Sequence, residues 1–254
     1  MLLSFLRDVF ISPNFYVRVV LINAGGYSNG TNAKAAGNKV YLSGGTFIAG
    51  TESTVNIYGG YAEESINSCA TNNETYVYGN VDLSNVALYG GVATGSGTPT
   101  ISDNTLIFGY KESSAFAYTP WAPDSYTIGS VKNFSTIRFD AAVWDKTITI
   151  NEFSNTSTDS TVTRVDATKV AFSVVDSLAK NDSYAMLKVI KFNSGSLALT
   201  SAKISESSTY TLGTTLQGSG TVSLSDSDDD NEYDTVTYTI GSIGPSGENS
   251  SDSG

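Results

Sequence analysis

Short apolar and aromatic segments recur along the chain, separated by runs of Gly, Asn, Ser and Asp. Segments of this length, rich in β-branched and aromatic residues and bounded by turn formers, predict β-strands. Apolar positions at helical spacing are nearly absent, so the sequence predicts an all-β protein. In the first part of the chain the segments are residues 17–22, 39–42, 55–58, 75–78, 86–89, 106–108, 126–128, 136–139 and 147–150.

A longer repeat lies over these strands. Gly25-Gly26-Tyr27 recurs 34 residues later as Gly59-Gly60-Tyr61, and a weaker third copy begins at Gly90-Gly91. An Ala-x-Asn triplet follows each of the first two copies at the same offset and ends at Asn38 and Asn72. One such unit cannot bury its own apolar face, so a fixed period indicates stacked units. We expect a β-solenoid, with an antiparallel sandwich joined by glycine-rich turns as the alternative.

Two residue types, glycine and asparagine, are suited to a stack of repeated units. The glycine pairs are expected to adopt positive φ at sharp corners. Asparagine at similar places in successive copies is expected to adopt left-handed backbone geometry and to form a ladder along the stack.

The pattern divides the chain into four parts. Residues 1–23 are an N-terminal segment to which no structure is assigned; they carry no basic stretch or cleavage site typical of a signal peptide. Residues 24–150 hold the repeats. Residues 151–243 alternate apolar and polar positions more regularly, and antiparallel pairing is one option there. Residues 244–254 are Ser, Gly and acid-rich, which predicts a disordered tail.

Composition excludes several classes of site. The chain of 254 residues has no histidine and one cysteine, which rules out nucleophile–histidine catalysis and His-containing metal sites. Lys and Arg number 14 against 25 acids, a net charge of -11, so nucleic acid is not an expected partner. No apolar run is long enough for a membrane-spanning helix.

An acidic run near the C-terminus is the one candidate metal site. Asp226, Asp228 and Asp230 are the possible ligands of a weakly held Ca²⁺ ion, although the glycine and final glutamate of an EF-hand loop are missing. The alternative is a solvated hairpin loop. No other cofactor is expected.

Aromatic side chains offer a candidate binding surface. Tyr61 and Trp121 are singled out, and Trp121, which lies in a long loop between two prolines, is expected to be exposed. The alternative places these rings at strand ends or in the core.

The sequence gives little support for a catalytic site or a redox site. Glu63-Glu64 and the pair Glu74 and Asp82 are the carboxylates within the repeats, and neither predicts the paired acids of a glycosidase. Cys69 is expected to be an inert thiol in a loop, with an intermolecular disulfide as the alternative.

The order of motifs resembles the passenger region of bacterial autotransporters, which are surface proteins of the type V secretion pathway. The Gly-Gly-Tyr repeat, Val131-Lys132-Asn133-Phe134 with Ile137-Arg138-Phe139 after it, and the strand region from Ala179 carry the likeness over roughly residues 24–243. The resemblance implies a right-handed parallel β-helix displayed on, or shed from, a Gram-negative outer membrane. The chain lacks the terminal alternating strands of a membrane barrel, so any barrel would lie outside it.

We therefore expect a non-enzymatic surface or secreted protein that adheres to glycans or proteins of host or neighbouring cells through loops on a β-helical stalk. A β-helical carbohydrate-active enzyme, either a polysaccharide lyase or hydrolase or a phage-tail depolymerase, is the first alternative. A structural spacer is the second.

Overall fold

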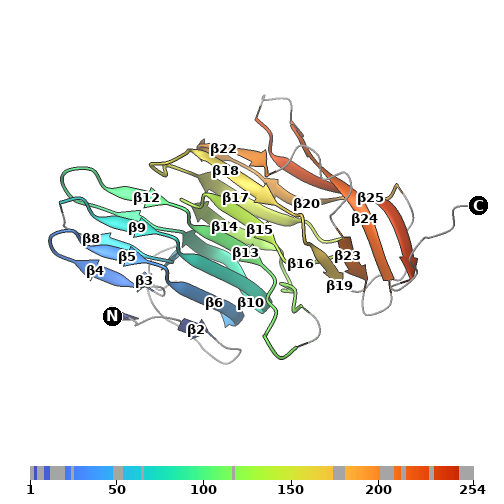
Figure 1. Cartoon of the computed structure of the whole chain (residues 1–254), viewed down its shortest axis with the longest axis horizontal. Coiled ribbons are helices and arrows are strands. Elements are labelled where there is room, and N and C mark those ends of the chain that lie inside the picture. The colour runs from blue at the N-terminus through green and yellow to red at the C-terminus, as the bar shows by residue number, and fades with distance from the viewer. Residues whose placement is uncertain are drawn as a thin grey trace, which may run out of the picture.

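The chain folds into strands and connecting turns in a computed structural model (Figure 1). Within the described residues there is no helix, hence none that is long and apolar enough to cross a membrane. The predicted all-β class is confirmed. The structure describes residues 3–4, 9–11, 21–23, 26–47, 54–63, 66–115, 118–173, 181–200, 209–212, 216–228 and 232–245.

Strands from successive turns of the chain lie side by side in parallel, in four stacks. The first stack is β4 (Tyr27–Asn29), β8 (Tyr61–Glu63) and β11 (Val92–Ala93). The second is β5 (Lys34–Ala36), β9 (Cys69–Thr71) and β12 (Thr100–Ser102). The third begins with β6 (Lys39–Thr46), the first half of β10 (Glu74–Tyr89) and β13 (Thr105–Phe108). The fourth begins with β7 (Val55–Tyr58), the second half of β10 and β14 (Thr127–Lys132).

Parallel pairing continues past residue 150. The third stack adds β15 (Thr136–Phe139), β18 (Val162–Asp166) and β22 (Ser196–Leu199). The fourth adds β17 (Ile148–Ser154), β20 (Ser183–Val189) and β21 (Phe192–Ser194). A further parallel row joins β16 (Ala141–Val143), β19 (Ala171–Ser173) and β23 (Thr209–Leu212). At the other end β1 (Leu3–Ser4) pairs with β3 (Leu21–Asn23), β3 with β7, and β2 (Val9–Ile11) with β6.

Among the described strands, antiparallel ladders lie at the C-terminal end, and a single antiparallel bridge joins Tyr110 and Thr119. The ladders pair β24 (Leu216–Ser225) with β25 (Thr235–Pro245), two strands that form a hairpin, and also pair β24 with β23 and β25 with β20. The hairpin covers the last strands of the parallel stacks, as the red strands in Figure 1 show. Gly244 and Pro245 belong to β25, while the rest of the predicted tail lies outside the described residues.

The glycine pairs serve close approach between turns rather than a left-handed corner. Gly59, Gly60, Gly90 and Gly91 do not adopt positive φ, which corrects the expectation for these copies. A Cβ on Gly60 would lie 2.6 Å from the carbonyl oxygen of Ala35, and one on Gly91 would meet Ala70 in the same way at 2.7 Å. Glycine is required because any side chain would collide with the preceding turn.

The asparagine ladder exists, in a register that differs by one residue from the sequence alignment. Asn38 is followed along the stack by Asn73 and Asn104, rather than by Asn72. The pairing offset is 34 residues at Tyr27–Tyr61 but 35 at Lys34–Cys69, because the second turn has one extra residue between these strands.

The position before each ladder residue is left-handed in all three turns. It holds Gly37, Asn72 and Asp103, with φ of 69°, 56° and 56°. Glycine, asparagine and aspartate are the residues that tolerate this conformation. Asn72 therefore supplies the backbone corner, while Asn73 supplies the ladder.

The core lies between the stacks. One row of it runs across the third stack through side chains with at most 1% exposure, in the order Val40, Thr75, Leu106, Ile137 and Val165. In β6, for example, Val40 and Leu42 alternate with partly exposed residues and face inward, as period-two patterning requires.

Candidate functional site

Two tyrosines lie side by side on adjacent strands of the first stack. The rings of Tyr27 and Tyr61 are stacked with centroids 5.9 Å apart and an interplanar angle of 14°. The Tyr27 hydroxyl donates to Glu63 Oε2 at 2.8 Å, and the Tyr61 hydroxyl lies 3.5 Å from Oε1 of the same carboxylate. Tyr27 is 36% exposed and Tyr61 is half-buried. We call Tyr27, Tyr61 and Glu63 the tyrosine row.

Trp121 is buried, so its predicted exposure is wrong. The ring is 2% exposed and stacks on Phe108, and its Nε1–H donates to the carbonyl oxygen of Val81 at 2.8 Å. The loop folds back so that Trp121 forms a single parallel bridge with Gly79. The flanking prolines suit a one-residue bridge because neither has an N–H to extend a ladder.

In the sequence the acidic run lies between β24 and β25, and the structure describes its two ends. Asp234 is buried and accepts hydrogen bonds from the backbone N–H and the hydroxyl of Ser227, which closes the loop. Asp226 Oδ1 accepts the N–H of Asp228 at 3.2 Å. Asp230 lies outside the described residues. The described parts of the chain bring together no group of three or more Asp, Glu, Cys or His side chains that could hold a metal ion.

The carboxylates of the repeats bind to their own neighbours. Glu74 accepts the Tyr76 hydroxyl at 2.8 Å and pairs with Lys39 at 3.1 Å. Burial alone would raise the pKa of Glu74, but these two partners outweigh burial and hold the pKa below its usual value. Asp82 accepts the N–H and the hydroxyl of Ser84. Glu74 is therefore held in its ionised form, whereas a general acid needs a raised pKa.

Cys69 and Glu64 are the other two residues that the sequence singled out. Cys69 lies in β9 rather than in a loop; it is half-buried, and its Sγ is 3.4 Å from Thr71 Oγ1. Glu64 lies outside the described residues.

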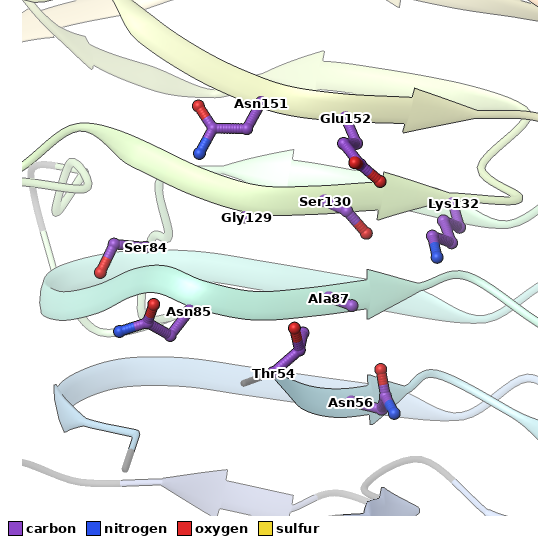
Figure 2. A pocket seen from close by; sticks show the side chains of 10 residues that line it. All are labelled: Thr54, Asn56, Ser84, Asn85, Ala87, Gly129, Ser130, Lys132, Asn151 and Glu152. Atoms are coloured by element: carbon purple, nitrogen blue, oxygen red, sulfur yellow. The ribbon is translucent and has the colours of Figure 1, made fainter. Parts of the chain in front are cut away.

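A polar groove crosses the outer face of the fourth stack (Figure 2). Its volume is about 360 Å³, within the usual range for ligand sites. The lining side chains come from β7, β10, β14 and β17 and from the residue before β7. Small residues form the middle of the floor, with Ala87 on β10 paired to Ser130 on β14 and Gly129 beside it.

An interrupted alternation places extra polar groups on this face. Three successive turns carry two small or polar residues between two core residues, and their first core residues pair with one another. The quartets are Leu83-Ser84-Asn85-Val86, Ile128-Gly129-Ser130-Val131 and Ile150-Asn151-Glu152-Phe153. Both central residues of each quartet line the groove.

An irregularity in β10 shapes the groove further. The β10–β14 register shifts between Leu83 and Ala87, as at a β-bulge. The bulged backbone comes so close that a Cβ on Gly129 would lie 2.8 Å from the Val86 carbonyl oxygen. Only glycine fits at this point of the floor.

The groove carries one charge of each sign. Lys132 Nζ donates to the Tyr89 hydroxyl at 3.2 Å and lies 5.1 Å from the centroid of that ring. Glu152 Oε2 accepts Asn193 Nδ2 at 3.3 Å. The Ser130 hydroxyl is buried on the floor and has no hydrogen-bond partner, a condition that costs about 1–3 kcal/mol.

None of the residues that line the groove is among the sites predicted from the sequence. The available signal was the recurrence of the apolar–polar–polar–apolar quartet in strands expected to alternate strictly. Comparisons with protein-family models, with curated proteins and with solved structures find no match for this chain.

Proposed function

We propose that the chain is a non-enzymatic binding protein that is secreted or displayed at a cell surface, built as a right-handed parallel β-helix like an autotransporter passenger. The parallel pairing of successive turns supports a helical path of the chain. Right-handed crossovers are the rule for parallel strands joined in this way. The later antiparallel hairpin would close the end of that coil.

The tyrosine row is the observation that carries the binding role. Two adjacent strands present equivalent rings whose centroids lie 5.9 Å apart, with Glu63 holding both hydroxyls. Tyrosine offers an apolar face and a polar edge to the same partner at low entropic cost. Two such rings side by side allow two weak contacts to act together. The proposed partners, which would use both the apolar face and the polar edge of the rings, are glycans and proteins of host or neighbouring cells.

Binding to surfaces tests this proposal. The labelled chain is titrated onto a panel of extracellular-matrix proteins, immobilised glycans and bacterial cells. Saturable binding is expected, and the double variant Tyr27→Ala/Tyr61→Ala should weaken it by roughly tenfold or more, the usual effect of losing aromatic contacts at a binding surface. Tyr233→Ala is the matched control, because Tyr233 is 59% exposed and lies at the opposite end of the chain.

Two outcomes would contradict the proposal. Release of shortened or unsaturated saccharides from the glycan panel would identify an enzyme. Failure to bind any member of the panel would leave a spacer as the better account.

A further inference from the structure

The polar groove over β7, β10, β14 and β17 has the form and the chemistry of a ligand site (Figure 2). We infer that it binds a neutral oligosaccharide lying across these strands. This inference goes beyond the tyrosine row, and it rests on the proposed function only in treating the chain as a protein that releases its ligand unchanged.

The groove is long enough for a few sugar units. Asn56, Ala87, Ser130 and Glu152 form one row of paired residues across four adjacent strands. With about 4.8 Å between neighbouring strands, this row spans about 14 Å. The small side chains in its middle leave a floor against which a sugar ring can lie, and the longer side chains of Asn56 and Glu152 stand at its two ends.

The lining suits hydroxyl groups better than charged or apolar ligands. Asn85 on β10 and Asn151 on β17 line the groove on the two sides of β14, and each amide can donate and accept, as a sugar hydroxyl does. Lys132 and Glu152 cancel in charge, and the net charge of -11 on the whole chain disfavours an anionic ligand. An apolar ligand would meet little besides Ala87.

Ser130 supplies an independent indication. Its side chain is 5% exposed, and its hydroxyl has no partner although it belongs to the lining of the groove. Buried hydroxyls in proteins are normally paired. A hydroxyl of a ligand that lies on the floor of the groove beside Ser130 would supply the missing partner.

Calorimetric titration with neutral oligosaccharides tests the inference. The probes are malto-, cello-, xylo-, manno- and chito-oligosaccharides, each from disaccharide to hexasaccharide. At least one series should bind saturably, with an affinity that rises with length until the groove is filled. Ser130→Ala should weaken binding by roughly tenfold, the equivalent of one hydrogen bond, without lowering the thermal midpoint. If Ser130 had only a structural role, Ser130→Ala would lower the affinity and the thermal midpoint together.

Two further variants complete the design. Ser157→Ala is the matched control, because Ser157 is also 5% exposed and also has an unpartnered hydroxyl, but lies outside the groove lining; it should bind as the unaltered chain does. Ala87→Gln should fill the floor and abolish binding while the far-ultraviolet circular dichroism of the β-sheet is retained.

The outcomes separate this inference from the proposed function. It is overturned if no neutral oligosaccharide binds, if only anionic saccharides bind, or if both groove variants bind as well as the unaltered chain. Surface binding that persists in those cases leaves the proposed function standing. Cleavage of a saccharide held in the groove would instead support the site and refute a non-enzymatic role.

Discussion

Buried amide side chains tie one turn of the chain to the next. Asn73 has no exposed surface; its Oδ1 accepts the backbone N–H of Asn38 at 3.1 Å and the side-chain Nδ2 of Asn38 at 2.8 Å. Its own Nδ2 donates to Asn104 Oδ1 at 2.9 Å and to the Ala35 carbonyl oxygen at 3.2 Å. Such a network is stabilising only when every member is satisfied, because the interior penalises each unpaired polar atom. The ladder therefore specifies register as well as stability.

Asn73→Ala should destabilise the protein by about 3 kcal/mol or more, because it leaves several buried donors and acceptors unpaired at about 1–3 kcal/mol each. Urea unfolding followed by circular dichroism measures the change. Asn80→Ala is the control, since Asn80 is exposed and lies in β10, the strand that Asn73 directly precedes. Equal losses in the two variants would show that the ladder adds nothing to stability.

The close packing of neighbouring strands requires glycine, which has no side chain, at particular positions. Gly60 and Gly91 occupy equivalent places in two turns, and both face the carbonyl oxygen of an alanine in the preceding turn. Gly129 has the same role in the fourth stack, opposite the bulge of β10. At these points the backbones of neighbouring turns approach so closely that a methyl group does not fit.

Gly60→Ala should cost about 1–3 kcal/mol, the usual penalty for overpacking, because its Cβ would lie 2.6 Å from a backbone oxygen and 2.7 Å from Asn73 Nδ2. Thermal and urea unfolding provide the measurement. Gly241→Ala serves as control, since the nearest atom to its Cβ would be 3.2 Å away. The close-approach explanation fails if the two substitutions have the same effect.

At the scale of the whole molecule, the parallel stacks end under an antiparallel hairpin. β25 pairs with β20 and carries Val236, Tyr238 and Ile240, which are fully buried. The rings of Tyr238 and Phe172 meet edge-on, with their centroids 5.1 Å apart. The hairpin therefore joins the core that the stacks enclose. An uncovered strand edge is a site for unwanted pairing with other chains, and the hairpin covers one.

A chain that ends at Thr200 should lose cooperative unfolding and form larger species, because β20 loses its antiparallel partner β25 and apolar side chains that pair with β25, such as Leu187, become exposed. Size-exclusion chromatography with light scattering checks this. A chain that ends at Pro245 keeps β25 and should elute as the full chain does. Unchanged size and cooperativity after the shorter truncation would show that the hairpin is dispensable.

The residues of the candidate sites show how far sequence reasoning reaches. Tyr61 was identified because it ends a repeated motif, and it does pair with Tyr27. Trp121 was misplaced because its burial depends on a return of its loop to Gly79, which is distant in sequence. The groove was missed because Ala87 and Ser130 are unremarkable separately and form a floor only when β10 and β14 pair.

By itself, the sequence determined the all-β class and the stacking of Gly-Gly-Tyr units, since strand patterning and turn residues are local signals. The tertiary structure decided which residues meet across turns. Asn38 faces Asn73 because one additional residue lengthens the second turn, and the direction of pairing reverses where β24 and β25 form a hairpin and β25 returns to β20. Such matters depend on loop lengths and contacts between distant segments, which no window of the sequence contains.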